Sequence, residues 1–288
     1  MKYSRIAGTG SYLPERTLTN ADIEKIVDTS DEWIVERTGI RERHIAADDE
    51  TTGDMALVAA QRAMEAAGVE PEEIDFLVLG TTTPDLVFPS TATLLQQRLG
   101  LKEVGAMDIN AACTGFLYAL SVADKFIKVG EAKKALVIGS ETLTRLVDWK
   151  DRGTCVLFGD GAGAAVLEAS DDGDGMLGAD LGADGVAGST MVFESLGTRR
   201  PLSSPRAPEN SRLHFEGQAV FKIAVRGIVE SVERAMRAAG VTADEVSLVV
   251  PHQANARIID AAVRRLGIDG ERVMLNIATH GNTSAASV

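Results

Sequence analysis

The chain has 288 residues, of which 42 are Asp or Glu and 29 are Lys or Arg, so its formal net charge is −13 at pH 7. This charge argues against a general nucleic-acid binder or a protein that binds anionic membranes. No apolar stretch is long enough to cross a bilayer, and the N-terminus "MKYSRIAGTGSYLP" has no secretory h-region. Two cysteines make neither a disulfide framework nor a thiolate zinc site, which predicts a cytoplasmic protein without a bound metal.

The predicted elements of the first part of the chain alternate between strands and helices. A helix ends at "RAMEAAGV" (62–69), and "EPEEIDFLVL" (70–79) reads as an acidic turn followed by an apolar strand. A further strand runs into "INAACTGF" (109–116), where a helix begins at Cys113. This alternation predicts a buried, largely parallel sheet with helices outside it.

The next segment reads as two strands around a Gly-rich turn. Strand "KALVIGS" (134–140) is followed by "TCVLFGDGAGAAVLEA" (154–169), in which Cys155 lies in the first strand as an inert core residue. The glycines could be mistaken for a phosphate-binding loop, but the strand-like "AAVL" that follows favours a tight β-turn.

A long segment rich in Gly, Pro and Ser spans residues 183–220 and has little periodicity. Two interpretations remain open. The segment is either a surface linker or a loop over an active-site entrance, since long loops in compact domains are often functional.

The second part of the chain repeats the first. "RAMRAAGV" (234–241) matches "RAMEAAGV", and "TADEVSLVVP" (242–251) then matches "EPEEIDFLVL". Further on, "NIATHGNTS" (276–284) lies over "MDINAACTG" (107–115). The shared order of elements predicts two copies of one helix-strand-helix-strand unit, with the halves at 1–170 and 171–288. The second copy stops inside the helix that begins near Asn282, so we expect a C-terminally shortened version of a longer design.

The repeat places Cys113 and Asn282 at the same position, where a strand ends and a helix begins. A helix N-terminus lowers the pKa of a thiol and favours the nucleophilic thiolate. Each residue also has a structural explanation, because Cys can fill a tight site and Asn is a good N-cap. His252, just past the repeated strand, would meet both residues if equivalent strand ends converge at the axis between the halves.

The order Cys, His, Asn and five specific segments resemble the thiolase-fold condensing enzymes, and in particular the β-ketoacyl-[acyl-carrier-protein] synthase III family. The segments are "DEWIVERTGIRERHIA" (31–46), "ACTGF" (112–116), "DRGTCVLFGDGAGAAVL" (151–167), "PHQAN" (251–255) and "GNTSAAS" (281–287). The resemblance implies an α/β, thiolase-like layered fold of two duplicated βαβαβ halves. A Gly-rich hairpin that follows in the family, and that completes an oxyanion hole there, would lie beyond Val288.

The resemblance also implies a two-step reaction in which a CoA thioester is a substrate and no metal or redox cofactor takes part. An acyl-CoA, usually acetyl-CoA, acylates Cys113. Malonyl-acyl-carrier protein then loses CO2, and its carbanion attacks the acyl-cysteine while His252 and Asn282 stabilise the enolate. The enzyme would be a homodimer.

Further residues are assigned only by the resemblance. Trp33 and Arg152 would sandwich the CoA adenine, with Arg37 near the phosphates. Phe221 and Lys222 would lie at the mouth of the CoA tunnel. Gln218 would contact the pantetheine, although it stands where many relatives carry Asn or Arg. Phe88 would reach across the dimer interface and limit the primer pocket. The predicted surface for the acidic carrier protein consists of Lys222, Arg257, Arg264 and Arg265.

Two other functions compete with this one. A related synthase with another primer or acceptor, such as a polyketide-starter enzyme, would share these residues, whereas a hydroxymethylglutaryl-CoA synthase would need a Glu that the loop "TTTPD" (81–85) lacks. The third possibility is an inactive shortened paralogue or fragment that serves only as a dimer partner.

Overall fold

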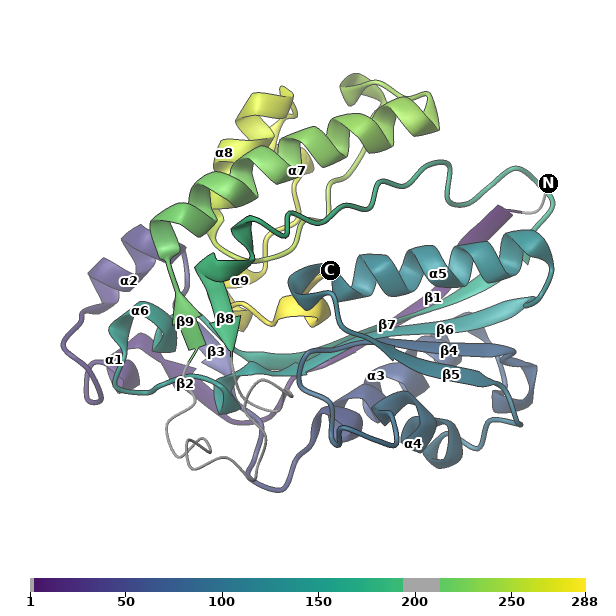
Figure 1. Ribbon diagram of the computed structural model, residues 1–288, viewed down its shortest axis with the longest axis horizontal. Coiled ribbons are helices and arrows are strands. Elements are labelled where there is room, and N and C mark those ends of the chain that lie inside the picture. Colours follow the sequence, from purple (N-terminus) through teal and green to yellow (C-terminus); the bar gives the residue numbers. More distant parts are fainter. Residues whose placement is uncertain (1–2, 194–212) are drawn as a thin grey trace.

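A five-stranded mixed sheet forms the centre of the computed structural model, which describes residues 3–193 and 213–288 (Figure 1). The strands follow the order β1-β7-β6-β4-β5. They comprise β1 (Tyr3–Tyr12), β4 (Phe76–Gly80), β5 (Gly105–Ile109), β6 (Lys134–Thr142) and β7 (Asp160–Ser170).

The sheet is less parallel than the sequence predicts. Strand β4 pairs in parallel with β5 and β6, but β7 runs antiparallel to both β6 and β1. The chain reverses after β6, so β7 begins beside the last residue of β6 and runs back along it. The expectation of a largely parallel sheet was therefore wrong for half of the strand pairings.

Helices cover both faces of this sheet (Figure 1). On β4, Leu77 and Leu79 point into the cluster formed with α3 (Thr52–Ala67) and α4 (Thr91–Arg98). Phe76 and Val78 point the other way, toward α5 (Gly115–Val129). Because successive side chains of a strand alternate in direction, a fully apolar strand such as β4 is the one that two helical layers can bury.

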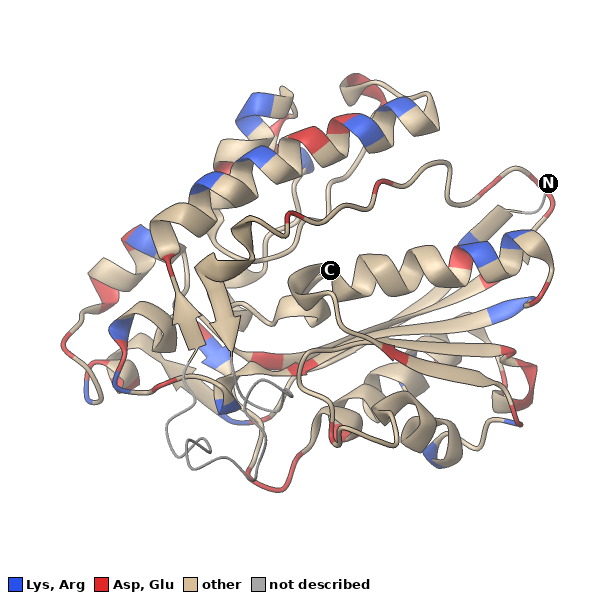
Figure 2. Cartoon of the chain, viewed as in Figure 1, with Lys and Arg blue, Asp and Glu red and all other residues tan. Residues whose placement is uncertain are grey.

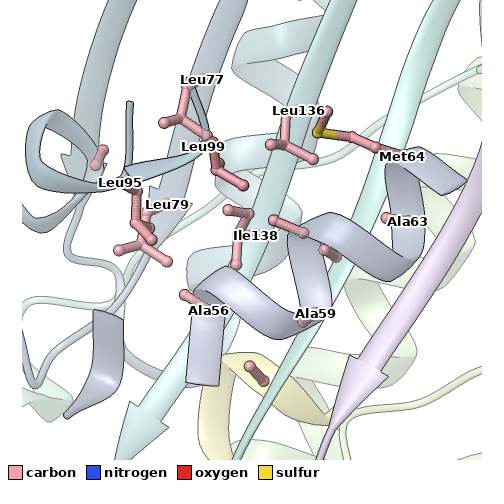
Figure 3. Packing of buried hydrophobic residues seen from close by; sticks show 14 of the residues in the cluster. Ala56, Ala59, Ala63, Met64, Leu77, Leu79, Leu95, Leu99, Leu136 and Ile138 are labelled. Carbon is pink, nitrogen blue, oxygen red and sulfur yellow. The ribbon is translucent and has the colours of Figure 1, made fainter. Parts of the chain in front are cut away.

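Helix α3 lies unusually close to the sheet because small residues face it. Ala56, Ala59 and Ala63 pack beside Leu136 and Ile138 (Figure 3). On the sheet side Gly10 meets the same helix, where a Cβ atom would come within 2.4 Å of the Ala59 carbonyl oxygen. The contact therefore depends on small side chains from both partners.

Short elements form an outer layer beside the end of the sheet that carries the site. They are β2 (Thr17–Thr19), α1 (Asn20–Ile23), α2 (Asp31–Thr38), β3 (Glu42–His44), α6 (Arg152–Cys155), β8 (Met191–Phe193) and β9 (Leu213–Phe215). Arg43 is fully buried among them and donates hydrogen bonds to Leu18, Asn20 and Val156. Burial lowers the pKa of this guanidinium to about 10.

The Gly-rich segment after α6 is not a turn. Cys155 lies in α6 rather than in a strand, and Asp160–Ser170 forms one continuous strand, so the predicted pair of strands around a β-turn was wrong. Glycine instead lets the backbone at Ala286 pack closely against this strand, because a Cβ atom at Gly163 would lie 3.3 Å from the Ala286 carbonyl oxygen.

The repeat appears clearly at the helix ends. Helices α3 and α7 (Gly217–Ala239) both end at a left-handed glycine, Gly68 with φ 63° and Gly240 with φ 70°. Each is followed by a 3-10 turn with a capping box, η1 (Pro71–Glu73) and η5 (Ala243–Glu245). The sequence match thus corresponds to matched local structure.

The strands of the second copy differ from those of the first. Within the described residues, the counterpart of β4 forms only a single parallel bridge, between Val249 and Val273. Leu248 and Leu275 are more than half exposed, so this pair of segments is not buried as β4 is. Two paired segments without further neighbours are only marginally stable as a sheet. The division into halves at residue 170 stays a prediction.

The remaining helices of the second part are α8 (Ala256–Leu266) and α9 (Ile277–His280), with the 3-10 turn η6 (Gly270–Arg272) between them. Helices α7 and α8 lie apart from the central sheet, and the segment that follows β7 runs between α5 and α7 (Figure 1). Of the predicted linker at 183–220, β8 and β9 pair as antiparallel strands and α7 begins at Gly217, whereas residues 194–212 lie outside the described part of the chain.

Candidate active site

Cys113 lies in the 3-10 turn η2 (Ala112–Thr114), between the end of β5 and the start of α5. Ala112 has a positive φ of 47°, and Gly281, its counterpart in the repeat, has a φ of 67°. A left-handed non-glycine residue costs roughly 1–3 kcal/mol and persists only where its surroundings hold it in place. Cys113 and Asn282 thus each follow directly after a residue with a positive φ.

Burial raises the pKa of the Cys113 thiol, a hydrogen bond from Ser284 lowers it, and the charge on Glu141 raises it further. The net direction is upward. The expectation that the start of a helix lowers this pKa was therefore wrong, because loss of water around the sulfur outweighs the favourable contacts.

His252 follows the bridged segment at Val249 and lies beside Ser287. Its Nδ1 atom is 2.6 Å from the Ser287 hydroxyl oxygen. Desolvation lowers the pKa of His252 to about 4, so the ring is neutral at pH 7. The single proton of the Ser287 hydroxyl has two acceptors within reach, Nδ1 and the Ser284 carbonyl oxygen at 2.8 Å. If it goes to Nδ1, the ring proton sits on Nε2, which has no hydrogen-bond partner among the described residues and is then a donor. If it goes to the carbonyl oxygen, Nδ1 carries the ring proton and Nε2 can only accept.

Hydrogen bonds hold Asn282 through its backbone N–H, its backbone carbonyl and its side-chain oxygen. Its N–H donates to the Leu157 carbonyl, and its own carbonyl accepts from the Gly159 N–H, both at 3.0 Å. The side-chain oxygen accepts the Ser284 N–H at 2.9 Å. The Asn282 Nδ2 group makes no bond within the described ranges and remains a potential donor.

One short segment, residues 282–287, connects the three predicted residues. It contains Asn282 itself and the whole of the 3-10 turn η7 (Ser284–Ser287). The Ser284 hydroxyl lies 3.6 Å from the Cys113 sulfur, and Ser287 bonds to His252. The structure thus brings Cys113, His252 and Asn282 to one place. The packing is tight, since a Cβ atom at Gly139 would lie 2.2 Å from the Ala285 carbonyl oxygen.

Glu141, near the end of β6, is a residue that the sequence analysis missed. It is fully buried and accepts hydrogen bonds from Ser284 and from all three threonines of the loop 81–83. Burial raises its pKa despite these donors. The signal for Ser284 and Ser287 was available in the "GNTSAAS" segment, whereas nothing local marks Glu141 as part of the site.

Comparisons with known proteins identify the family of this chain. Two family models match the chain, "3-Oxoacyl-[acyl-carrier-protein (ACP)] synthase III" over residues 107–185 and its C-terminal counterpart over residues 236–288. A β-ketoacyl-[acyl-carrier-protein] synthase III of Xanthomonas euvesicatoria is 56% identical over 286 residues, which cover 99% of this chain and 87% of that protein. The chain belongs to the β-ketoacyl-[acyl-carrier-protein] synthase III family.

Solved structures of this family have the same fold. The 3-oxoacyl-[acyl-carrier-protein] synthase III of Aquifex aeolicus superimposes with a TM-score of 0.92 at 49% identity, covering 99% of this chain and 88% of the other. The priming β-ketosynthase of the R1128 polyketide pathway has the same TM-score at 38% identity, covering 99% and 85%. The predicted thiolase-like α/β fold is confirmed.

Three of the residues that the synthase III resemblance assigns to CoA, Trp33, Arg37 and Arg152, lie together on α2 and α6. The Arg152 guanidinium lies 4.8 Å from the centre of the Trp33 ring, and that of Arg37 lies 5.6 Å from it. The backbone oxygen of Arg37 accepts from the side chain of Asn255, which caps α8. Arg152 thus stacks directly on Trp33, so a base between them requires the two side chains to separate.

Helices α7 and α8 carry the other contacts that the resemblance predicts, and their Lys and Arg residues are marked in Figure 2. The Arg257 guanidinium lies 5.9 Å from the Phe221 ring, while Gln218, Lys222 and Arg265 are exposed. Arg264 forms an ion pair with Asp260 one turn earlier. Arg264 is therefore partly neutralised, whereas Lys222 and Arg265 have no ion-pair partner among the described residues.

Phe88 lies at the surface of the chain. It is 83% exposed and lies next to Val87, which is 71% exposed. Nearby, Leu86, Val87 and Met107 line a hollow at β5, the strand at the edge of the sheet.

Two negative findings concern the described residues, 3–193 and 213–288. They contain no cluster of three or more His, Cys, Asp or Glu side chains that could hold a metal ion. None of their helices combines the length and the apolar character that a membrane span requires. Both cysteines are free thiols.

Proposed function

We propose that this chain catalyses the initiating condensation of fatty-acid synthesis. The reaction joins an acyl-CoA, with acetyl-CoA as the preferred primer, to malonyl-[acyl-carrier protein] and yields 3-oxoacyl-[acyl-carrier protein], CO2 and CoA. The observation that supports it most is the meeting of Cys113, His252 and Asn282 around one segment, in a chain that belongs to the synthase III family.

In the first half-reaction, the Cys113 sulfur attacks the acyl thioester and CoA leaves. The residue lies in a turn that opens directly into α5, whose unpaired N–H groups favour negative charge at this end. The position suits a nucleophile that must carry charge briefly rather than at rest, because burial keeps the resting thiol protonated.

In the second half-reaction, negative charge develops on the thioester oxygen of the malonyl group as CO2 leaves. His252, in the tautomer that carries its proton on Nε2, would supply one hydrogen bond to that oxygen, and the Asn282 amide would supply the other. Loss of one such preorganised donor typically costs about 2.7–4 kcal/mol of barrier. A neutral histidine suits this role, since it stabilises the enolate without giving up its proton at rest.

The substrate contacts follow the path from α6 to α7. We assign the CoA nucleotide to Trp33, Arg152 and Arg37, and the tunnel to Phe221 and Gln218. The exposed cations of α7 and α8 at Lys222, Arg257 and Arg265, with Arg264 beside them, fit an acidic carrier protein, because complementary charge steers association.

We further propose a homodimer built on the edge strand β5. Leu86, Val87 and Phe88 expose apolar surface beside that open edge, and an uncovered edge is a template for pairing with another chain. A second copy would cover them and place Phe88 at the partner's primer pocket. The two free thiols suit a reducing compartment such as the cytoplasm.

Intact-mass measurement after mixing with acetyl-CoA tests the proposal. A single acetyl adduct that disappears in Cys113→Ala, while Cys155→Ala keeps it, supports the enzyme. Product formation with malonyl-carrier protein then separates a fatty-acid initiator from a synthase with another primer. Folded protein that gains no adduct would instead support an inactive dimer partner.

A further inference from the structure

Three side chains from three separate elements form a buried hydrogen-bonded chain at the candidate nucleophile. The Ser284 hydroxyl oxygen lies 3.6 Å from the Cys113 sulfur and 3.2 Å from a Glu141 carboxyl oxygen. A hydroxyl has one proton to donate and can also accept. Ser284 therefore has two acceptors within reach for its single proton, one on each side.

The surroundings of Glu141 favour a carboxylate that accepts. Besides Ser284, the backbone N–H groups of Thr82 and Thr83 donate to it, as do the hydroxyls of the loop 81–83, with the shortest contact at 2.7 Å from Thr83. None of the ion pairs found in the described part of the chain includes Glu141. A buried carboxylate without a cation is poised to take up a proton.

The titratable groups at this place come from three directions. Cys113 comes from η2, Glu141 from β6, and His252 from the segment 251–255, while the loop 81–83 and the turn η7 contribute only hydroxyls and amides. His252 is a poor proton acceptor at neutral pH, and its Nδ1 already faces Ser287. Burial raises the pKa of both the thiol and the Glu141 carboxyl, so the carboxyl accepts a proton more readily than it would in water.

We propose that Ser284 and Glu141 form a proton relay that takes the proton of Cys113 as its sulfur attacks the acyl thioester. This rests on the proposed function. The sulfur–acyl bond forms, the S–H proton passes to the Ser284 oxygen, and the Ser284 hydroxyl proton passes to Glu141. CoA leaves as a thiolate and takes a proton from water.

The relay runs backward in the condensation step. The enolate carbon attacks the acyl-cysteine, the carbon–sulfur bond of Cys113 breaks, and the sulfur leaves as a thiolate. Ser284 gives this thiolate its proton and recovers one from Glu141, which returns to the carboxylate. Glu141 thus stores one proton for the lifetime of the acyl-enzyme. Ser284 touches the reacting sulfur, whereas Glu141 acts through it as a positioning residue.

The test is the single-turnover rate of Cys113 acetylation by acetyl-CoA, measured by rapid quench and intact mass from pH 6 to 9. In the wild type we expect a rate that levels off above the pH at which Glu141 ionises. Glu141→Gln and Ser284→Ala should each be at least tenfold slower at pH 7, and their rates should keep rising about tenfold per pH unit. The variant that combines both substitutions should be no slower than the slower of the two single variants, because each substitution interrupts the same relay.

Asp160→Asn is the matched control. Asp160 is also a fully buried carboxyl held by a threonine and by backbone N–H groups, of Ala46 and Thr144, but it does not touch Ser284. This variant should keep the wild-type pH profile. Thermal unfolding identifies variants that do not fold. If Glu141→Gln is among them, Ser284→Ala decides alone, since it removes a single oxygen atom.

A second measurement separates a relay from a simple charge effect. The thiolate absorbance near 240 nm, taken relative to Cys113→Ala, reports the thiol pKa, and loss of the neighbouring negative charge should lower it in Glu141→Gln. A pure charge effect then makes this variant acetylate faster, whereas the relay makes it slower. Acetylation as fast as in the wild type, with the same pH profile, overturns the relay and leaves the function standing. No acetylation of the wild type overturns both.

Discussion

The low pKa of His252 has a consequence for stability that a titration can measure. In the folded protein this pKa is about 4, against 6.5 for a free histidine. Between these values the unfolded chain binds a proton that the native ring does not accept. Stability therefore falls as the pH drops through this window, and the change His252→Gln should remove that part of the fall.

The magnitude follows from the size of the shift. A change of one pKa unit corresponds to about 1.36 kcal/mol, so the whole window is worth about 3 kcal/mol. The isoelectric point of about 4.8 makes the lower end of the window impractical, because solubility is poorest there. Between pH 7.5 and pH 5.5, the same linkage gives a loss of about 1.3 kcal/mol.

Urea unfolding at these two pH values provides the assay. The loss of unfolding free energy in the wild type should exceed that in His252→Gln by about 1.3 kcal/mol. His214→Gln is the matched control for the removal of a histidine, since His214 is exposed in β9 and lies outside the candidate site. Parallel pH dependences for the wild type and His252→Gln would refute the desolvated, neutral ring.

Four further variants test other parts of the structure. Gly139→Ala should slow Cys113 acetylation at least tenfold and lower the melting temperature, because its Cβ atom would lie 2.2 Å from the Ala285 carbonyl; an unchanged acetylation rate contradicts the tight packing. Trp33→Ala should raise the KM for acetyl-CoA about tenfold with little change in kcat, and steady-state kinetics that show the reverse pattern would exclude a binding role. Lys222→Glu should raise the KM for malonyl-carrier protein several-fold at low salt and much less at high salt, whereas a salt-independent effect argues against electrostatic docking. Leu136→Ala should cost about 2–5 kcal/mol of unfolding free energy in urea, since the residue is fully buried between α3 and the sheet; a loss below 1 kcal/mol speaks against that packing.

The helix ends could be predicted because their signals are local. Gly68 and Gly240 each close a helix in the left-handed conformation, which a glycine adopts more readily than any other residue. The junction at Cys113 was equally readable, since an apolar strand, a short turn and an amphipathic helix follow one another without a gap. Each of these predictions needed only neighbouring residues.

The failures concern contacts between residues far apart in the chain. Gly163 looked like part of a turn because a strand seldom tolerates glycine, but its purpose is the approach of Ala286. Glu141 and Ser284 are 143 residues apart in the sequence, and His252 and Ser287 are 35 residues apart. The periodicity of a sequence does not predict contacts between residues so far apart. The prediction of a lowered pKa for Cys113 failed for a related reason. Its direction depends on how much water the folded chain removes from the sulfur.

The tight docking of residues 282–287 against β6 has a consequence for biosynthesis. Cys113 and its sheet belong to the part of the chain that leaves the ribosome first, and domains tend to fold in that order. Until residues 282–287 have been synthesised, the cysteine lacks Ser284, and His252 lacks Ser287. The nascent chain therefore carries a thiol without these contacts, and under the proposed function we expect its reactivity toward acyl donors to arise only after residues 282–287 have docked.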